Sequence, residues 1–142
     1  TASKLNDYLD KVIQQESGGN PDAQSGTSSA SGPFGIINST YNSYAGKLGL
    51  TGDKNDPTNQ RAVAAALTKD NDQVLKSNGL SITDGNRYAL HFLGSVDGPE
   101  VLSAPNDNLV SDYVSNKVLK ANPQLVGMTV GQFRKFTMGI GK

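Results

Sequence analysis

The sequence predicts a mainly α-helical fold with at most a small β-sheet. Apolar residues recur at intervals of three and four along several segments, which is the spacing of an amphipathic helix. Glycine or an Asn-Pro pair follows most of these segments, as at Gly79 and at Asn122-Pro123. The chain has 142 residues and 35% hydrophobic content. One domain over residues 1–142 with an ordinary core is therefore expected, and because the chain begins at Thr1 we interpret it as part of a longer polypeptide.

The first helix is expected to begin after Ser3 and to end near Ser17, where Gly18 or Gly19 supplies a left-handed residue. Its apolar stripe consists of Leu5, Tyr8, Leu9, Val12 and Ile13. Continuing the stripe by one turn leads to Glu16. A carboxylate therefore lies on the face that should pack against the core.

A polar loop follows over residues 22–32, and it leads into the apolar stretch P33-F34-G35-I36-I37. We interpret this stretch as a short strand or a buried turn beside the first helix. Any sheet should lie between residues 33 and 41.

Five more helices are expected along the rest of the chain. Most have a side-chain cap or a proline at the start and a glycine or Asn-Pro at the end. The first is opened by Asp56 as cap and Pro57 as first helical residue, runs through residues 61–76 and is closed by Gly79. The others are residues 87–94 after Ser81 or Thr83, residues 99–104 from Pro99, residues 111–121, and residues 129–138 capped by Thr129.

The composition excludes several classes of function. Thirteen basic and thirteen acidic residues give a formal net charge of zero, so there is no basic field to attract nucleic acid. Without cysteine there is no disulfide, thiolate site or cysteine nucleophile, and a single histidine argues against a histidine-rich metal site. No apolar run approaches the roughly 18 residues needed to cross a membrane. We expect no cofactor and no metal.

Glu16 is the strongest candidate for a catalytic residue. Only one other glutamate, Glu100, occurs in the chain. Glu16 lies on an apolar stripe and close to a helix C-terminus, and both positions disfavour the ionised carboxylate. The protonated form is what a general acid needs in order to protonate a leaving oxygen.

The segment ESGGNPDAQSG followed by GPFGI resembles the opening motif of the soluble-type (SLT) lytic transglycosylases, which have a lysozyme-like fold. In that family a Glu-Ser pair ends a helix, Asn-Pro follows, and a serine stands nine residues after the glutamate. Glu16-Ser17, Asn20-Pro21 and Ser25 fit this pattern. Gly32 to Ile36 takes the place of the family's Gly-Leu-Met-Gln-Ile segment, after one extra residue. The resemblance implies a mainly α, lysozyme-like domain with a groove for peptidoglycan glycan strands.

Two later motifs are similar to the family in order but less specific. Residues 90–94 (LHFLG) match an Ala-Tyr-Asn-Ala-Gly motif, and Tyr113-Val114 matches a Tyr-Val pair in a late helix. The sequence departs from the family where Gly35 replaces a glutamine, His91 a tyrosine and Phe92 an asparagine. The resemblance implies substrate contacts from the following residues: Ser25, Phe34, Gly35, Ile36, His91, Phe92 and Tyr113. Phe34 and Phe92 could equally be core or groove wall, and His91 a structural residue.

Most glycosidases need a second carboxylate, and Asp10, Asp22 and Asp97 are the candidates here. The family needs none. The resemblance implies that Glu16 protonates the glycosidic oxygen and then removes a proton from the primary hydroxyl of the same sugar, which leaves a 1,6-anhydro-muramyl end. Ser25 would hold the substrate's N-acetyl group or orient Glu16.

Two rival interpretations remain open. One is a muramidase on the same fold, in which Asp22 or Asp97 activates water. The other is an inactive cell-wall-binding or structural module. For the setting, the sequence favours a phage virion protein, from the tail or the interior, that acts in the host periplasm. The alternative is a bacterial periplasmic enzyme, and in either case a larger virion or envelope assembly is a conceivable partner.

Overall fold

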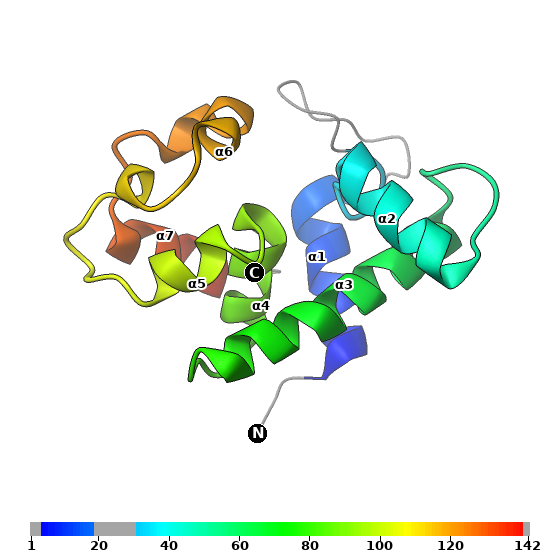
Figure 1. The fold of residues 1–142 in the computed structure, drawn as a ribbon, viewed down its shortest axis with the longest axis horizontal. Coiled ribbons are helices and arrows are strands. Elements are labelled where there is room, and N and C mark those ends of the chain that lie inside the picture. Colours follow the sequence, from blue (N-terminus) through cyan, green and yellow to red (C-terminus); the bar gives the residue numbers. More distant parts are fainter. Residues whose placement is uncertain (1–3, 19–30, 141–142) are drawn as a thin grey trace. The chain divides into compact units, whose positions relative to one another are not determined.

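A computed structural model describes residues 4–18 and 31–140 (Figure 1). Contacts along the chain divide it into two units, which we call the N-terminal unit (Lys4–Lys69) and the C-terminal unit (Asp70–Ile140). Helix α3 (Pro57–Ser77) contributes residues 57–69 to the first and 70–77 to the second. The expected mainly helical fold is confirmed, since the described residues form seven α-helices and two short 3₁₀ helices.

The N-terminal unit begins with α1 (Leu5–Ser17). The expected end of this helix is confirmed, because Gly18 has a φ of 61° and donates its N–H to the carbonyl of Gln14. Left-handed backbone of this kind carries a penalty for any residue with a Cβ, which explains the glycine. The expected apolar face is also present, with Tyr8, Leu9 and Val12 buried.

Helix α2 (Asn38–Leu48) was not expected from the sequence. Residues 38–41, which we placed at the edge of a possible sheet, form its first turn. The segment NSTYNSYAGKL is rich in Ser, Thr and Asn, which bond to nearby backbone and so weaken the helical signal. Only Tyr41 is buried, so no apolar stripe reveals the helix.

The start of α3 agrees with the sequence. Pro57 occupies the first helical position, and Asp56 Oδ1 accepts hydrogen bonds from the backbone N–H groups of Thr58 and Asn59 at 2.9 and 3.1 Å. These bonds satisfy donors that have no partner inside the helix. The helix ends before Gly79, whose φ is 69°.

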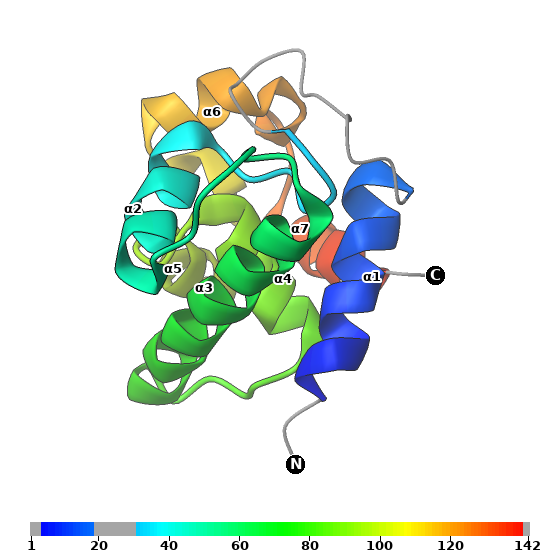
Figure 2. The ribbon, with the colours of Figure 1, turned by 90° about the vertical axis from the view of Figure 1, so that its right-hand side faces the viewer.

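The C-terminal unit contains α4 (Asp84–Leu93), α5 (Asp97–Leu102), α6 (Asn116–Ala121) and α7 (Val130–Met138). Helix α4 contacts both α5 and α7, and the two views agree that α7 runs alongside it (Figures 1 and 2). A buried apolar cluster fills this unit, and its largest members come from α3, α4, α7 and the segment before α7: Leu75, Leu90, Phe133 and Leu125.

Side-chain caps fix the helix starts in this unit. Thr83 and Thr129 cap α4 and α7 as expected, and Thr129 forms a reciprocal capping box with Gln132. The single helix expected over residues 111–121 is wrong. The chain instead forms a 3₁₀ turn at Val110–Asp112 and restarts as α6, because Ser115 is extended and accepts from the N–H of Val118.

No sheet occurs among the described residues, which contain only two isolated antiparallel bridges, Ser31 to Ile36 and Leu109 to Thr129. Helix α5 begins at Asp97, two residues before the expected Pro99. Over the described part of the chain, no helix is long and apolar enough to span a membrane.

Candidate active site

Glu16 lies in the last turn of α1, where the sequence places it, one turn after the buried Val12. Its side chain is half-buried, between the fully buried Val12 and the exposed Gly18. The Glu16 residue is therefore partly covered by protein and partly open to solvent. This is the arrangement that a proton-transfer group needs.

The wall beside Glu16 is a tight turn over residues 31–36, which we call the glycine turn. Its ends pair in an antiparallel bridge, with the Ser31 and Ile36 N–H groups donating to each other's carbonyls at 3.3 and 3.1 Å. Two glycines adopt positive φ inside it, Gly32 at 82° and Gly35 at 60°. The apolar stretch is therefore a buried turn, one of the two forms expected for it.

The Gly35 backbone lies close beside the Glu16 carboxyl group. A Cβ placed on Gly35 would lie 2.7 Å from Glu16 Oε2, so the Glu16 carboxyl would have to shift to accommodate it. A side chain at position 35 would therefore be strained by the backbone angle and would displace the Glu16 carboxyl. The expected contact of Gly35 with substrate stays a prediction.

Ser17, the second half of the Glu-Ser motif, bonds α1 to the glycine turn. Its hydroxyl Oγ lies 2.9 Å from the carbonyl oxygens of both Ile13 and Pro33 and shares its proton between them. The helix end that carries Glu16 and the turn that contacts its carboxyl are therefore joined by the residue next to Glu16.

Gln60, which the sequence analysis did not single out, is bonded to the turn beside Glu16. It is fully buried in the first turns of α3, and its amide bonds the glycine turn. Ser17 comes before the turn in the sequence, and Gln60 comes after it. A signal was available. The buried face of α3 runs through Val63, Ala64 and Thr68, and continuing it backwards by one turn leads to position 60.

A second polar group contacts the start of the glycine turn. Lys54 Nζ donates to Ser31 Oγ at 2.9 Å, and Ser31 Oγ donates to Asn55 Oδ1 at 2.9 Å. Partial burial lowers the pKa of the Lys54 ammonium below its usual value, because desolvation penalises the charged form.

Of the other substrate residues expected in the N-terminal unit, some are buried and one lies outside the described residues. Phe34 is 0% exposed and Ile36 is 3% exposed, so both side chains belong to the interior and support the glycine turn from within. Ser25 and Asp22 lie outside the described residues.

His91, Phe92 and Tyr113 belong to the C-terminal unit. His91 and Phe92 are half-buried on α4, and their rings lie 5.9 and 6.0 Å from that of Tyr88. Tyr113 follows the 3₁₀ turn rather than lying in an α-helix, and its hydroxyl accepts from Asn108 Nδ2 at 2.5 Å. Their proposed roles toward a substrate stay predictions.

The two described candidates for a second carboxylate are both engaged by the protein. Asp97 Oδ2 accepts from the backbone N–H of Ser115 at 3.0 Å, which anchors the segment before α6. Asp10 is paired with Arg61 at 3.0 Å. Each contact gives the carboxylate a structural role. Nowhere in the described part do three or more histidine or acidic side chains gather as metal ligands.

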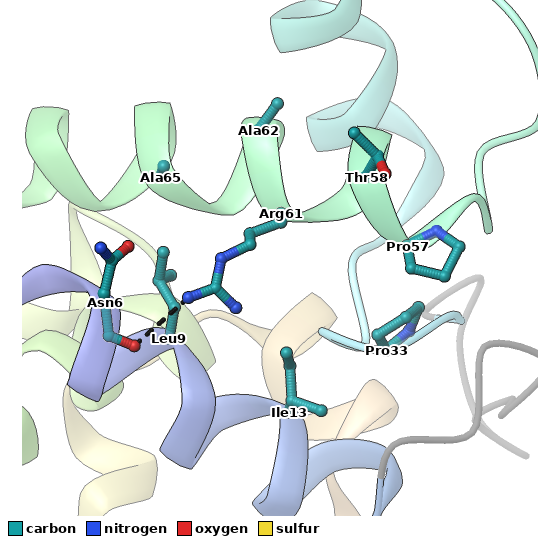
Figure 3. Close-up of a pocket in the computed structure, with 9 residues that line it drawn as sticks. All are labelled: Asn6, Leu9, Ile13, Pro33, Pro57, Thr58, Arg61, Ala62 and Ala65. Atoms are coloured by element: carbon teal, nitrogen blue, oxygen red, sulfur yellow. Dashed lines mark hydrogen bonds between the residues drawn. The ribbon is translucent and has the colours of Figure 1, made fainter.

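A shallow hollow of about 470 Å³ opens on the N-terminal unit between α1 and α3. Figure 3 shows Ile13 and Pro33 at one end and the Arg61 guanidinium reaching across from α3 toward Asn6, whose carbonyl accepts from it at 3.3 Å. The lining is mostly apolar, and the hollow shares Ile13 and Pro33 with the Ser17 contacts.

The comparison with protein families matches residues 3–84 to the transglycosylase SLT domain. The match covers more than half of the chain and includes Glu16, the glycine turn and Gln60. The chain belongs to the transglycosylase SLT domain family. Members of this family are generally lytic transglycosylases that act on peptidoglycan. The matched segment ends before His91, Phe92 and Tyr113, and no curated protein matches the chain.

Proposed function

We propose that this SLT domain cleaves the β-1,4 bond between N-acetylmuramic acid and N-acetylglucosamine without water, with Glu16 as the single acid and base. The observation that carries the proposal is the contact of the half-buried Glu16 carboxyl with Gly35, within the segment matched to the family. Close backbone on one side restricts the carboxyl to a defined direction. Such positioning favours proton transfer.

In the proposed reaction, Glu16 donates its proton to the glycosidic oxygen as the C1–O bond breaks. The substrate's own N-acetyl carbonyl stabilises the cationic C1. The Glu16 carboxylate then takes the proton of the C6 hydroxyl while O6 bonds to C1, which restores the acid and gives a 1,6-anhydro sugar. No water is consumed, so no second carboxylate is required. The structural contacts of Asp97 and Asp10 support this assignment.

The remaining expected substrate contacts are part of the same proposal. Ser25 holds the N-acetyl group or orients Glu16, and the backbone around Gly35 lines the sugar site. His91 would orient the acid or the substrate through a ring nitrogen, with Phe92 and Tyr113 as groove walls.

The first test is Glu16→Gln, which keeps the shape of the side chain and removes the transferable proton. General acid–base catalysis is worth about 10²–10⁴-fold, so cleavage of purified peptidoglycan should fall by at least that factor. Glu100→Gln, the same change at an exposed position, is the matched control and should leave the rate unchanged. More than a tenth of the original rate in Glu16→Gln would remove Glu16 from the mechanism.

The second test is the mass of the products. Lyase cleavage gives fragments that are lighter by one water per bond cut than those of a muramidase. Anhydro ends support the proposal, whereas reducing ends together with an inactive Asp97→Asn or Asp22→Asn variant would establish a hydrolase. An intact domain that binds peptidoglycan and releases no products would establish a binding module.

For the setting, we propose that the domain belongs to a phage virion protein, from the tail or the interior, and opens the host cell wall from the periplasmic side. The departures from the family motifs at His91 and Phe92 support this over a resident periplasmic enzyme. Detection of the domain by mass spectrometry in purified virions would support it. Detection only in the periplasm of uninfected cells would contradict it.

A further inference from the structure

Gln60 uses both ends of its buried amide. Its Oε1 accepts from the N–H of Phe34 at 3.1 Å, and its Nε2 donates to the carbonyls of Ser31 and Lys54 at 3.2 and 3.0 Å. The side chain is 0% exposed. Three bonds to backbone saturate the two donor protons and one acceptor site of this amide.

These bonds fix the glycine turn to α3. One partner, Ser31, begins the turn, and another, Phe34, directly precedes Gly35. The backbone of Gly32 lies so close to the amide that a Cβ on it would be 2.6 Å from Gln60 Nε2. Figure 3 shows Pro33 of the glycine turn beside Pro57 at the start of α3.

The glycine turn is thus bonded by two side chains from two helices, Ser17 of α1 and Gln60 of α3. Gly35 directly follows the bonded residues Pro33 and Phe34, and its backbone lies close beside the Glu16 carboxyl. A turn bonded only through its own bridge would have freedom to shift. A displacement of about 1 Å in a group that positions a catalytic residue can cost about 10²-fold in rate.

We infer that Gln60 is a positioning residue for catalysis: its amide fixes the glycine turn, and the turn fixes the direction of the Glu16 carboxyl. The inference rests on the proposed function of Glu16. It assigns to position 60 an effect on turnover that acts through Gly35, with no contact of Gln60 with substrate.

The test replaces Gln60 by methionine, which has nearly the same length and volume but no hydrogen-bonding amide. With soluble peptidoglycan glycan oligomers as substrate, kcat should fall by at least about 10-fold, since the turn loses its anchor, while KM should change less than about 3-fold. Gln60→Glu keeps the acceptor for Phe34 N–H and should give an intermediate kcat. A kcat for Gln60→Met within 2-fold of the original would overturn the inference.

Thr68→Val is the matched control for a merely structural effect. Thr68 is also buried on α3, and its Oγ1 donates to the carbonyl of Ala64 at 2.7 Å within the helix, away from the glycine turn. Both variants are assayed well below their melting temperatures. The control should lose stability and retain kcat, and an equal loss of kcat in both variants would reduce Gln60 to a stability residue and overturn the inference.

A double-mutant cycle of Gln60→Met with Gly35→Ala makes the coupling explicit. Because both changes act on the same turn, their effects on kcat should be non-additive, and full additivity would contradict the inference. If Gln60→Met does not fold, the isosteric Gln60→Glu replaces it in the comparison and in the cycle. Glu16→Gln is measured in parallel. An active Glu16→Gln would defeat the proposed function itself, whereas an inactive Glu16→Gln with a fully active Gln60 variant would defeat only the inference on Gln60.

Discussion

Each unit contains an ion pair between an arginine and an aspartate, and the two pairs differ in their exposure to solvent. In the N-terminal unit Arg61 meets Asp10 through one 3.0 Å contact, and the side chains are 35% and 68% exposed. In the C-terminal unit Arg87 meets Asp72 through two parallel bonds of 2.9 Å, with exposures of 5% and 16%. A pair that water surrounds contributes little, whereas a buried charge depends on its partner.

The buried polar groups of the two units differ in a related way. In the C-terminal unit the buried pair joins α3 to α4 beside an apolar cluster, so its role is to stabilise the fold. In the N-terminal unit the buried amide of Gln60 bonds a turn that contacts the candidate acid. The buried charge of Arg87 therefore stabilises the fold of one unit, whereas the buried amide of Gln60 bonds the turn beside the candidate acid in the other.

The largest effect on stability is expected from Asp72→Asn. The change removes the charge of one partner from a largely buried ion pair, which costs about 3–5 kcal/mol of unfolding free energy. Urea unfolding followed by circular dichroism measures it. The double replacement of Asp72 and Arg87 by apolar residues of similar volume should recover much of the loss, and a loss below about 1 kcal/mol in the single variant would show that this pair behaves like the exposed one.

The next largest effect on stability is expected from Gly35→Ala, for which Gly18→Ala is a closely matched control. The two glycines have φ values of 60° and 61°, so the backbone penalty, about 1–2 kcal/mol, is the same. A Cβ at Gly18 meets nothing within 4 Å, whereas one at Gly35 meets Glu16 Oε2 at 2.7 Å. Both variants should lose similar stability from strain, and only Gly35→Ala should also lose at least about 10-fold in peptidoglycan cleavage. Equal activities would show that the contact with Glu16 is not needed.

Helices α1 and α3 could be predicted from the sequence because their capping residues and apolar stripes indicate the same helix. Asp56-Pro57, Gly18 and the stripe ending at Glu16 each gave a local signal that the structure confirms. Helix α2 was missed because its polar residues give no stripe, and residues 111–121 were joined into one helix because the cap at Ser115 was overlooked. Gln60 was missed because a glutamine near a helix start is ordinarily exposed. The buried face of α3 indicates that position 60 is buried, but the partners of its amide are visible only in the structure.

A smaller effect is expected at the helix caps. Thr129 accepts from the N–H of Gln132 at 3.1 Å, so Thr129→Ala should lower the unfolding free energy by about 1 kcal/mol and Thr129→Ser should restore it. The matching position before α1 is Lys4, which makes no side-chain cap bond. Lys4→Ala should therefore change stability by less than about 0.5 kcal/mol. Equal losses at both positions in thermal unfolding would contradict this contrast.

The smallest effect is expected from Asp10→Asn, which breaks the exposed ion pair. In water and salt such a pair contributes about 0–1 kcal/mol, since solvent screens both charges and the side chains lose freedom when they pair. The remaining charge of Arg61 stays hydrated at the rim of the hollow and keeps its bond to the carbonyl of Asn6. The difference in unfolding free energy between Asp10→Asn and the original protein should shrink further between low salt and about 1 M salt. The loss in Asp72→Asn should change much less with salt, because water and ions have little access to that pair. If both losses fell equally with salt, burial would not be what separates the two pairs, and the difference between the units would have to come from the second hydrogen bond of Arg87 alone.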